Sequence, residues 1–171
     1  MTPINIIAKS IELIPVDELA GYPGNARVHS SDQIALLCGM IQEYGFTTPL
    51  LIDGGGTLIA GHGRLAAARS LGMFEVPCIR ASHLSHAQIK ALVVADNKIA
   101  LGSSWNMDLL KAEIEAIKEM DESLLGLTGF DFSELDEILD GILTEEGSNK
   151  DGPLPKIHFL SVGGHKVELT A

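Results

Sequence analysis

Aromatic residues, cysteines and positive charges are all scarce in this sequence of 171 residues. Aromatic residues make up 5% of the chain, so its core must be built mainly from Leu, Ile, Val and Ala, as in helices packed on a sheet. The length suits one domain with a small appendage and is too short for two full domains. We therefore expect a single domain that combines helices with a sheet.

The chain has two cysteines, and neither stands in a metal-binding pattern. Cys38 and Cys78 both lie among apolar residues, without a CxxC motif or a paired histidine spacing. This excludes a zinc site of the usual kind and predicts two buried, reduced thiols.

Long apolar runs are also missing. Gly, His, Arg or Pro interrupts each apolar stretch before it reaches the roughly 20 residues that span a bilayer. No basic start precedes an apolar signal core, which predicts a cytoplasmic protein without a membrane partner.

Lys and Arg number 12 against 23 Asp and Glu, which gives a formal net charge of −11. Affinity for nucleic acid depends largely on neutralised phosphates, so weak or no autonomous DNA binding is expected. The acids crowd into residues 108–151, whereas most cationic side chains precede residue 100. A local cationic pocket in an acidic protein is therefore compatible with the composition.

Apolar periodicity and turn signals predict the order of elements. Ser30 with Gln33, and Ser85 with Gln88, have capping-box spacing before helical patterns. The expected strands cover 11–15, 49–53, 57–60 and 76–80, with a Gly-rich turn at 53–56. The expected helices cover 30–45, 64–72, 85–98, 106–120 and 133–143. We divide the chain into a domain (1–102), an acidic helical extension (103–143), a linker (144–155) and a hairpin (156–171).

Three short motifs have the chemistry of a phosphate site. Gly61-His62-Gly63-Arg64 stands between a strand and a helix, where free backbone N–H groups favour an anion and Arg64 adds a bidentate contact. The alternative is a tight turn with solvated His and Arg side chains.

The other two motifs are a loop and a helix end. Arg27 and His29 lie in the segment Asn25 to His29 that ends an irregular loop, although such side chains are often simply solvated. Asp96 and Asn97 offer oxygen atoms that suit Mg²⁺, and Lys98 can meet a phosphate. Asn and Lys also occur at helix ends for purely structural reasons.

The order and spacing of these motifs resemble the N-terminal domain family of ParB, of the ParB/sulfiredoxin type. The resemblance covers roughly residues 11–101 and includes Thr48-Pro49-Leu, Gly61 to Arg64 and Asp96 to Lys98. It is closest to the branch associated with DNA methyltransferases and phage or plasmid genes. It implies an α+β fold with a small mixed sheet and helices, followed by an acidic helical extension. The C-terminal hairpin is expected from the two apolar runs around Gly163 and Gly164.

The resemblance also implies functional roles. The Gly-x-x-Arg element of the family holds nucleotide phosphates at a helix start, and Thr48 falls near the nucleotide. The implied ligand is a nucleoside phosphate (CTP, ATP or ADP) with Mg²⁺ at Asp96 and Asn97. The nucleotide-binding residues are then Arg27, His29, Thr48, Gly61, His62, Gly63, Arg64, Asn97 and Lys98.

The sequence departs from this family at several positions. His62 and Gly63 match neither the Glu-Arg pair of ParB proteins nor the Cys-His pair of sulfiredoxins, which argues against sulfinic-acid reduction. Gly-His-x-Arg is similar to the free-serine kinases of the superfamily, where the histidine serves the active site. Asp96 replaces the usual Glu, and Ala100 stands where Arg is usual, so hydrolysis is less secure than binding.

Three functions therefore stay open at the level of sequence. The first is a nucleotide-binding module, with slow Mg²⁺-dependent hydrolysis as an option, which assists a DNA methyltransferase or another DNA-processing or DNA-packaging partner. The second is an enzyme, either an amino-acid kinase with His62 and Asp96 as catalytic residues or a metal-dependent nuclease. The third is a non-catalytic interaction protein. The oligomeric state is open, with a dimer plausible.

Overall fold

The computed structural model describes residues 10–99, 102–141, 161–162 and 165–166. A four-stranded mixed sheet lies at the centre of the N-terminal domain, in the order β1-β4-β2-β3. β2 and β4 pair in parallel, whereas β1 pairs with β4, and β3 with β2, in antiparallel fashion. The strands are β1 (Glu12–Pro15), β2 (Leu50–Ile52), β3 (Leu58–Ala60) and β4 (Glu75–Arg80). The predicted α+β class with a small mixed sheet is confirmed.

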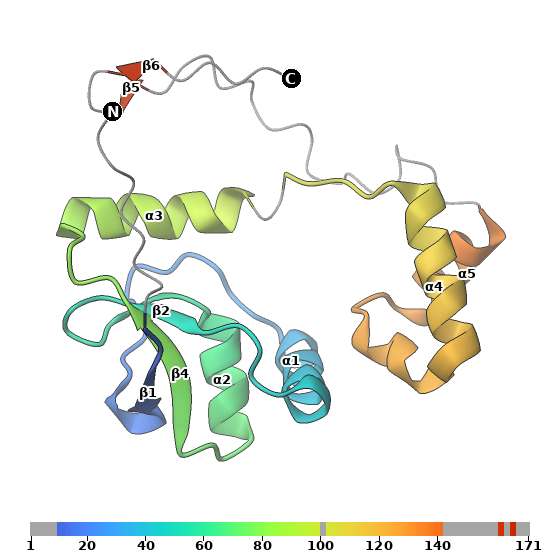
Figure 1. Cartoon of the computed structure of the whole chain (residues 1–171), viewed down its shortest axis with the longest axis horizontal. Helices are drawn as coiled ribbons and strands as arrows, with labels where there is room; N and C mark the ends of the chain where they lie inside the picture. The colour runs from blue at the N-terminus through green and yellow to red at the C-terminus, as the bar shows by residue number, and fades with distance from the viewer. Residues whose placement is uncertain (1–9, 100–101, 142–160, 163–164, 167–171) are drawn as a thin grey trace.

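The two faces of the sheet carry different apolar clusters because successive strand residues point to opposite sides. Leu50 and Ile52 are fully buried with Leu65 of α2 (His62–Ser70), and α1 (Ser31–Tyr44) packs outside α2. On the opposite face Ile59 packs with Val93 of α3 (His86–Ile99). Figure 1 shows α3 and α2 on opposite sides of the sheet. The domain therefore consists of a sheet between two helical layers.

Helix α2 begins at His62 and not at Arg64, where it was predicted to start. Gly61 adopts a left-handed conformation (φ 99°, ψ 26°), and its carbonyl accepts the N–H of Leu65 at 3.0 Å. Such a positive φ is easy for glycine alone. His62 and Gly63 consequently lie in the first helical turn.

The two cysteines differ in burial. Cys78 is fully buried in the sheet, and this burial raises the pKa of its thiol. Cys38 is only half-buried on α1, and the prediction that both thiols are buried is wrong for it. The reason is that α1 forms an outer layer and has no fully buried residue of its own.

The helical extension forms a small core of its own. It contains α4 (Met107–Asp121), a 3₁₀ segment η2 (Glu122–Leu127) and α5 (Phe132–Asp140). Helix α5 starts in a capping box of Asp131 and Glu134, and it ends at Asp140, with Gly141 as its C-cap, instead of at the predicted residue 143. The η2 segment was not predicted. The apolar cluster of the extension consists of Leu110, Ile114, Leu125, Leu135 and Ile138.

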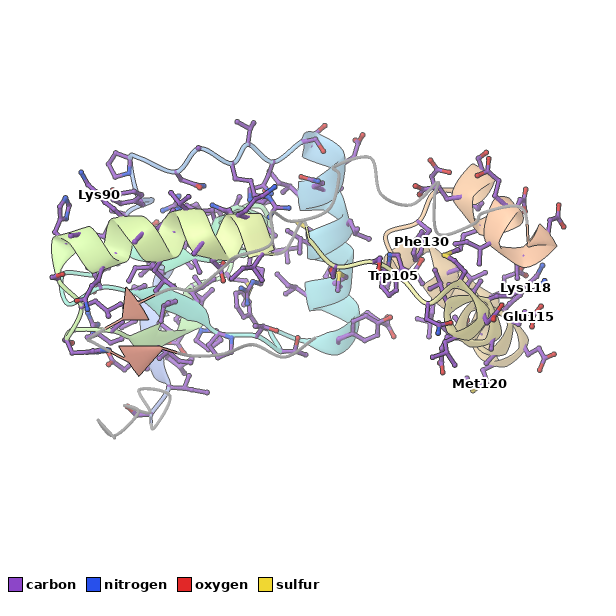
Figure 2. The ribbon with its side chains drawn as sticks, turned by 90° about the horizontal axis from the view of Figure 1, so that it is seen from above. Lys90, Trp105, Glu115, Lys118, Met120 and Phe130 are labelled. Atoms are coloured by element: carbon purple, nitrogen blue, oxygen red, sulfur yellow. The ribbon has the colours of Figure 1, made fainter. Side chains whose placement is uncertain are left out.

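One apolar contact joins the extension to the domain, and an aromatic contact packs Trp105, near the start of the extension, against Phe130. A Cβ placed on Gly39 of α1 would lie 2.8 Å from Leu127 Cδ2, so Leu127 packs directly on the α1 backbone. The Trp105 and Phe130 rings lie 5.8 Å apart between centroids at a tilt of 56°. Both residues are labelled in Figure 2. This tilted pairing is a favourable aromatic geometry.

Two short strands follow, β5 (Ser161–Val162) and β6 (His165–Lys166), and they pair in antiparallel fashion. They agree with the hairpin expected over 156–171; its other residues and the linker at 144–155 lie outside the described residues. The domain boundaries stay predictions. Among the described residues, no helix has both the length and the apolar character needed to cross a bilayer.

Candidate functional site

A cavity of about 240 Å³ lies at the N-terminus of α2. Five segments meet there: the loop before α1, α1 itself, the end of β3, the first turn of α2 and the last turn of α3. The first motif is thus joined by two others that are distant in sequence. The cavity is lined by Asn25, Arg27, His29, Leu37, Ile59, Ala60, Gly61, His62, Gly63, Arg64, Asp96 and Asn97.

The backbone at Gly61 gives this cavity its anion-binding character. The turn at Gly61 directs the chain from β3 into α2, so the unpaired N–H groups of the first helical turn belong to cavity-lining residues. A helix N-terminus carries a partial positive charge, and no acidic residue stands in this first turn. The site therefore favours a negatively charged group.

His62 has an unusual environment for a polar side chain. Its Nε2 atom is buried and has no hydrogen-bond partner in the described part of the chain. Burial lowers the pKa of His62, and the nearby His29 lowers it further. Because an unsatisfied buried polar atom is costly, this nitrogen is a candidate for a bond to a ligand or to water.

Arg64 links the cavity to the start of β2. Its Nη1 group donates to the carbonyl oxygens of Thr48 and, at 3.2 Å, Pro49. Burial lowers the pKa of Arg64, while the charge of Asp96 acts in the opposite direction. Two carbonyl bonds fix the guanidinium and leave its other N–H groups for an anion. Arg64 is therefore a structural tie as well as a candidate phosphate ligand.

Asn25 connects the loop to α3, and the set of site residues predicted from sequence omitted it. Its Oδ1 accepts the Arg27 N–H and Asn97 Nδ2, both at 3.3 Å, and its Nδ2 donates to the Arg27 carbonyl at 3.2 Å. Asn side chains commonly bond to nearby backbone in loops, which was the available signal. The bond to Asn97, however, depends on the tertiary fold.

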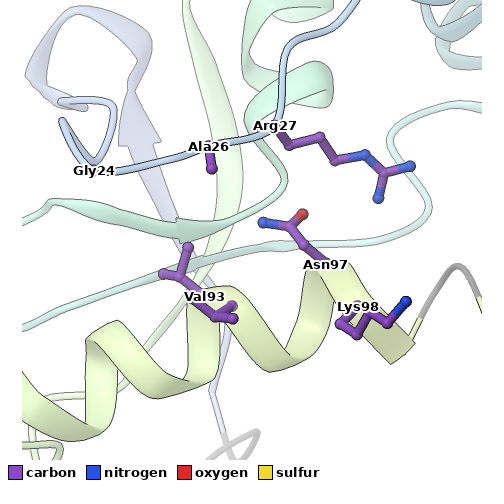
Figure 3. Close-up of a pocket in the computed structure, with 7 residues that line it drawn as sticks. Gly24, Ala26, Arg27, Val93, Asn97 and Lys98 are labelled. Carbon is purple, nitrogen blue, oxygen red and sulfur yellow. The ribbon is translucent and has the colours of Figure 1, made fainter. Parts of the chain in front are cut away.

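Two neighbouring cavities extend the site. One of about 340 Å³ shares Arg27 and Asn97 with the first, and Figure 3 shows Ala26 and Val93 at its apolar end. Lys98 lines this cavity and not the first. A small cavity of about 80 Å³ on the other side is lined by Thr48 and Arg64 among others.

The predicted site residues therefore gather in one region. Lys98 and Thr48 line the two neighbouring cavities, and the other predicted residues line the central one. Thr48 meets Arg64 through its carbonyl oxygen. The roles of these residues in binding stay predictions.

The donor set allows only a limited metal site. Asp96 is exposed, and Asn97 uses its Nδ2 on Asn25, which leaves its Oδ1 for a cation. Within the described residues there is no group of three or more His, Cys, Asp or Glu that could hold a metal. Mg²⁺ prefers oxygen ligands and is often held jointly by carboxylate and phosphate. Asp96 and Asn97 fit Mg²⁺ that arrives with a phosphate ligand.

Lowering the pH is expected to destabilise the protein through His62. Its pKa in the folded state lies below the ordinary 6.5, so the unfolded chain binds more protons between these two values. The contribution of neutral His62 is present above pH 6.5 and is lost as the pH falls through the folded pKa. The melting temperature should fall as the pH is lowered below about 6.5, and less steeply in His62→Gln. Parallel slopes in the two proteins would contradict this expectation.

Known proteins with similar sequences place the chain in a family, although no family model matches it. The "ParB-like nuclease domain-containing protein YnaK" of Escherichia coli (strain K12) is 49% identical over 74 residues, which are 43% of this chain and 85% of that protein. The chain belongs to the ParB-like nuclease domain family. The "Probable chromosome 2-partitioning protein ParB" of Deinococcus radiodurans is 32% identical over 101 residues, 56% of this chain and 34% of that protein.

The fold of this ParB-like chain agrees with the sequence relationship. A C-terminally truncated chromosome-partitioning protein ParB from Caulobacter crescentus, complexed with CTP-gamma-S, superposes with a TM-score of 0.63 at 18% identity. The match covers 82% of this chain and 90% of that one. The matched share is larger than the share of the chain that the N-terminal domain makes up. The ParB-like arrangement therefore includes part of the helical extension. The sequence resemblance covered roughly residues 11–101 and implied an acidic helical extension after them.

Proposed function

We propose that this ParB-like domain binds a nucleoside phosphate, with its phosphates at the N-terminus of α2. The observation that carries the proposal is the gathering of Arg27, Arg64, His29 and His62 around one cavity in a protein of net charge −11. Two arginines, a helix N-terminus and a buried histidine nitrogen without a partner favour a multiply charged anion. The CTP analogue in the similarly folded Caulobacter crescentus ParB supports a nucleotide.

The arrangement also supports separate binding positions for the phosphates and for Mg²⁺. The phosphates would contact the first turn of α2 and Arg64, with Mg²⁺ shared between the phosphates, Asp96 and Asn97. Lys98 and Arg27 add positive charge from the neighbouring cavity. The bound metal would neutralise phosphate charge. Slow hydrolysis, a DNA-processing or methyltransferase partner, a dimer and the cytoplasmic location stay predictions.

The test is calorimetric titration of the full chain with CTP, ATP, GTP and ADP, each with and without Mg²⁺. The matched controls are the nucleosides without phosphate. We expect one or more nucleotides to bind more tightly with Mg²⁺, and the nucleosides to bind much more weakly. If no nucleotide gives a heat of binding, the proposal is overturned and a non-catalytic interaction protein is favoured.

A second candidate function, an amino-acid kinase, is favoured by the state of His62. Its lowered pKa makes the imidazole neutral at pH 7, the form that can accept a proton from a substrate hydroxyl. Incubation with ATP or ADP and a panel of hydroxyl amino acids, followed by mass spectrometry, tests this. A blank panel would exclude these substrates. A nuclease has less support, because the described residues offer no carboxylate cluster for two metals.

A further inference from the structure

The position of His29 in the cavity depends on the absence of a side chain at Gly63. A Cβ built on Gly63 would lie 3.2 Å from His29 Cε1 and 3.3 Å from His29 Nδ1. It would also lie 2.9 Å from Leu37 Cδ1 of α1. The imidazole of His29 and a methyl group of Leu37 therefore occupy the space that the Cβ of a larger residue at position 63 would need.

The conformation of Gly63 gives no other reason for a glycine. Its φ is not positive, unlike that of Gly61, and it lies within α2. Glycine is a poor helix residue compared with alanine in such a position. Gly63 is also buried, so the close approach of its neighbours is the feature that requires it.

This close approach brings together two histidines that are distant in the sequence. His29 immediately precedes Ser30, the N-cap of α1, whereas His62 opens α2. Both line the same cavity, and the charge of His29 contributes to the lowered pKa of His62. Arg27, Arg64 and Asp96 are the charged groups that surround the pair.

We propose that Gly63 is a positioning residue, which admits the His29 imidazole to the phosphate cavity, so that His29 acts as a phosphate ligand supplied by another element. The identity of the ligand rests on the proposed nucleotide function. The position of the His29 ring in the cavity is independent of that function. A cationic side chain at residue 63 would extend from its Cβ into the space that the His29 ring occupies. The loop before α1 thus completes a site that the α2 motif only begins.

The first test reads the placement without a nucleotide. NMR spectra of the histidine rings are recorded for the full chain and for Gly63→Ala, with His29→Gln to assign the His29 signals. We expect the His29 and His62 signals to move, while those of His83 and His86, which do not line the cavity, stay unchanged. An unmoved His29 signal in folded Gly63→Ala would overturn the inference.

The second test measures nucleotide affinity in a double-mutant cycle. Gly63→Ala and His29→Ala should each lower affinity about five- to tenfold, equivalent to one weakened hydrogen bond to a charged group. The double variant should lie within about twofold of either single variant, because both remove the same contact. Losses that multiply would show that the residues act independently, which contradicts the proposal.

Two further variants separate positioning from overpacking. Gly39→Ala introduces a similar contact, 2.8 Å from Leu127, at a helix position outside the cavity, so affinity should be unchanged. Gly63→Arg with His29→Ala should regain affinity relative to Gly63→Arg alone, because the removed ring leaves room for the new cation. If Gly63→Arg binds nucleotide equally well with and without His29→Ala, the His29 ring does not occupy the space that the arginine needs, which contradicts the proposal. If wild type binds no nucleotide, the proposed function fails while the NMR result still decides the placement.

Discussion

Arg64→Ala is expected to lower nucleotide affinity about a hundredfold. A hydrogen bond to a charged group contributes roughly 1.5–3 kcal/mol, and each 1.4 kcal/mol changes affinity about tenfold. Arg64 combines a phosphate contact with two bonds to the Thr48 and Pro49 carbonyls, so its loss also frees the start of β2. Calorimetric titration with the nucleotide that binds best measures the change, with circular dichroism to confirm the fold.

Arg69→Ala is the matched control for this effect. Arg69 lies on the same helix and also donates to a backbone carbonyl, that of Leu19 at 2.7 Å, but it does not line the cavity. The variant removes one charge and one arginine–carbonyl bond without touching the proposed phosphate position. Its affinity should therefore stay within about twofold of wild type. Equal losses in the two variants would mean that Arg64 acts through the fold and not through phosphate.

The sequence predicted the elements of the domain well because their signals are local. Ser30 caps α1 through the Gln33 N–H, and Ser85 exchanges bonds with Gln88, as their spacing indicates. Short runs of apolar residues next to turn residues likewise predicted the strands. The errors occur where tertiary contacts or single-residue conformations decide, as at Gly61, whose left-handed φ starts α2 earlier than the helix-favouring residues suggested.

The site could be predicted only in part from the sequence. Each motif was visible by itself, but the contact between His29 and Gly63 and the bond between Asn25 and Asn97 join residues far apart in the chain. Pattern and spacing carry no information on such pairs. The carbonyl partners of Arg64 were hidden for the same reason, since backbone acceptors have no sequence signature.

Gly61→Ala should be among the most destabilising single substitutions in the domain. Alanine at a φ of 99° is strained, at a cost of about 1–2 kcal/mol. The new Cβ would also lie 2.6 Å from Leu50 Cδ2, and Leu50 is fully buried in the core. Overpacking of this kind costs roughly 1–3 kcal/mol more. Urea unfolding should therefore show a total loss of about 2–5 kcal/mol.

Gly72→Ala separates the two causes because it shares the strain without the clash. Gly72 has a φ of 67°, and a Cβ there would have no neighbour within 4 Å. We expect it to lose only the strain component, about 1–2 kcal/mol, and to keep its nucleotide affinity. Equal losses at the two glycines would show that Leu50 yields to the new methyl group. A larger loss at Gly61, together with weakened binding, would show that the packing of Leu50 against the turn holds the first N–H groups of α2 in place, so that core and site depend on the same residue.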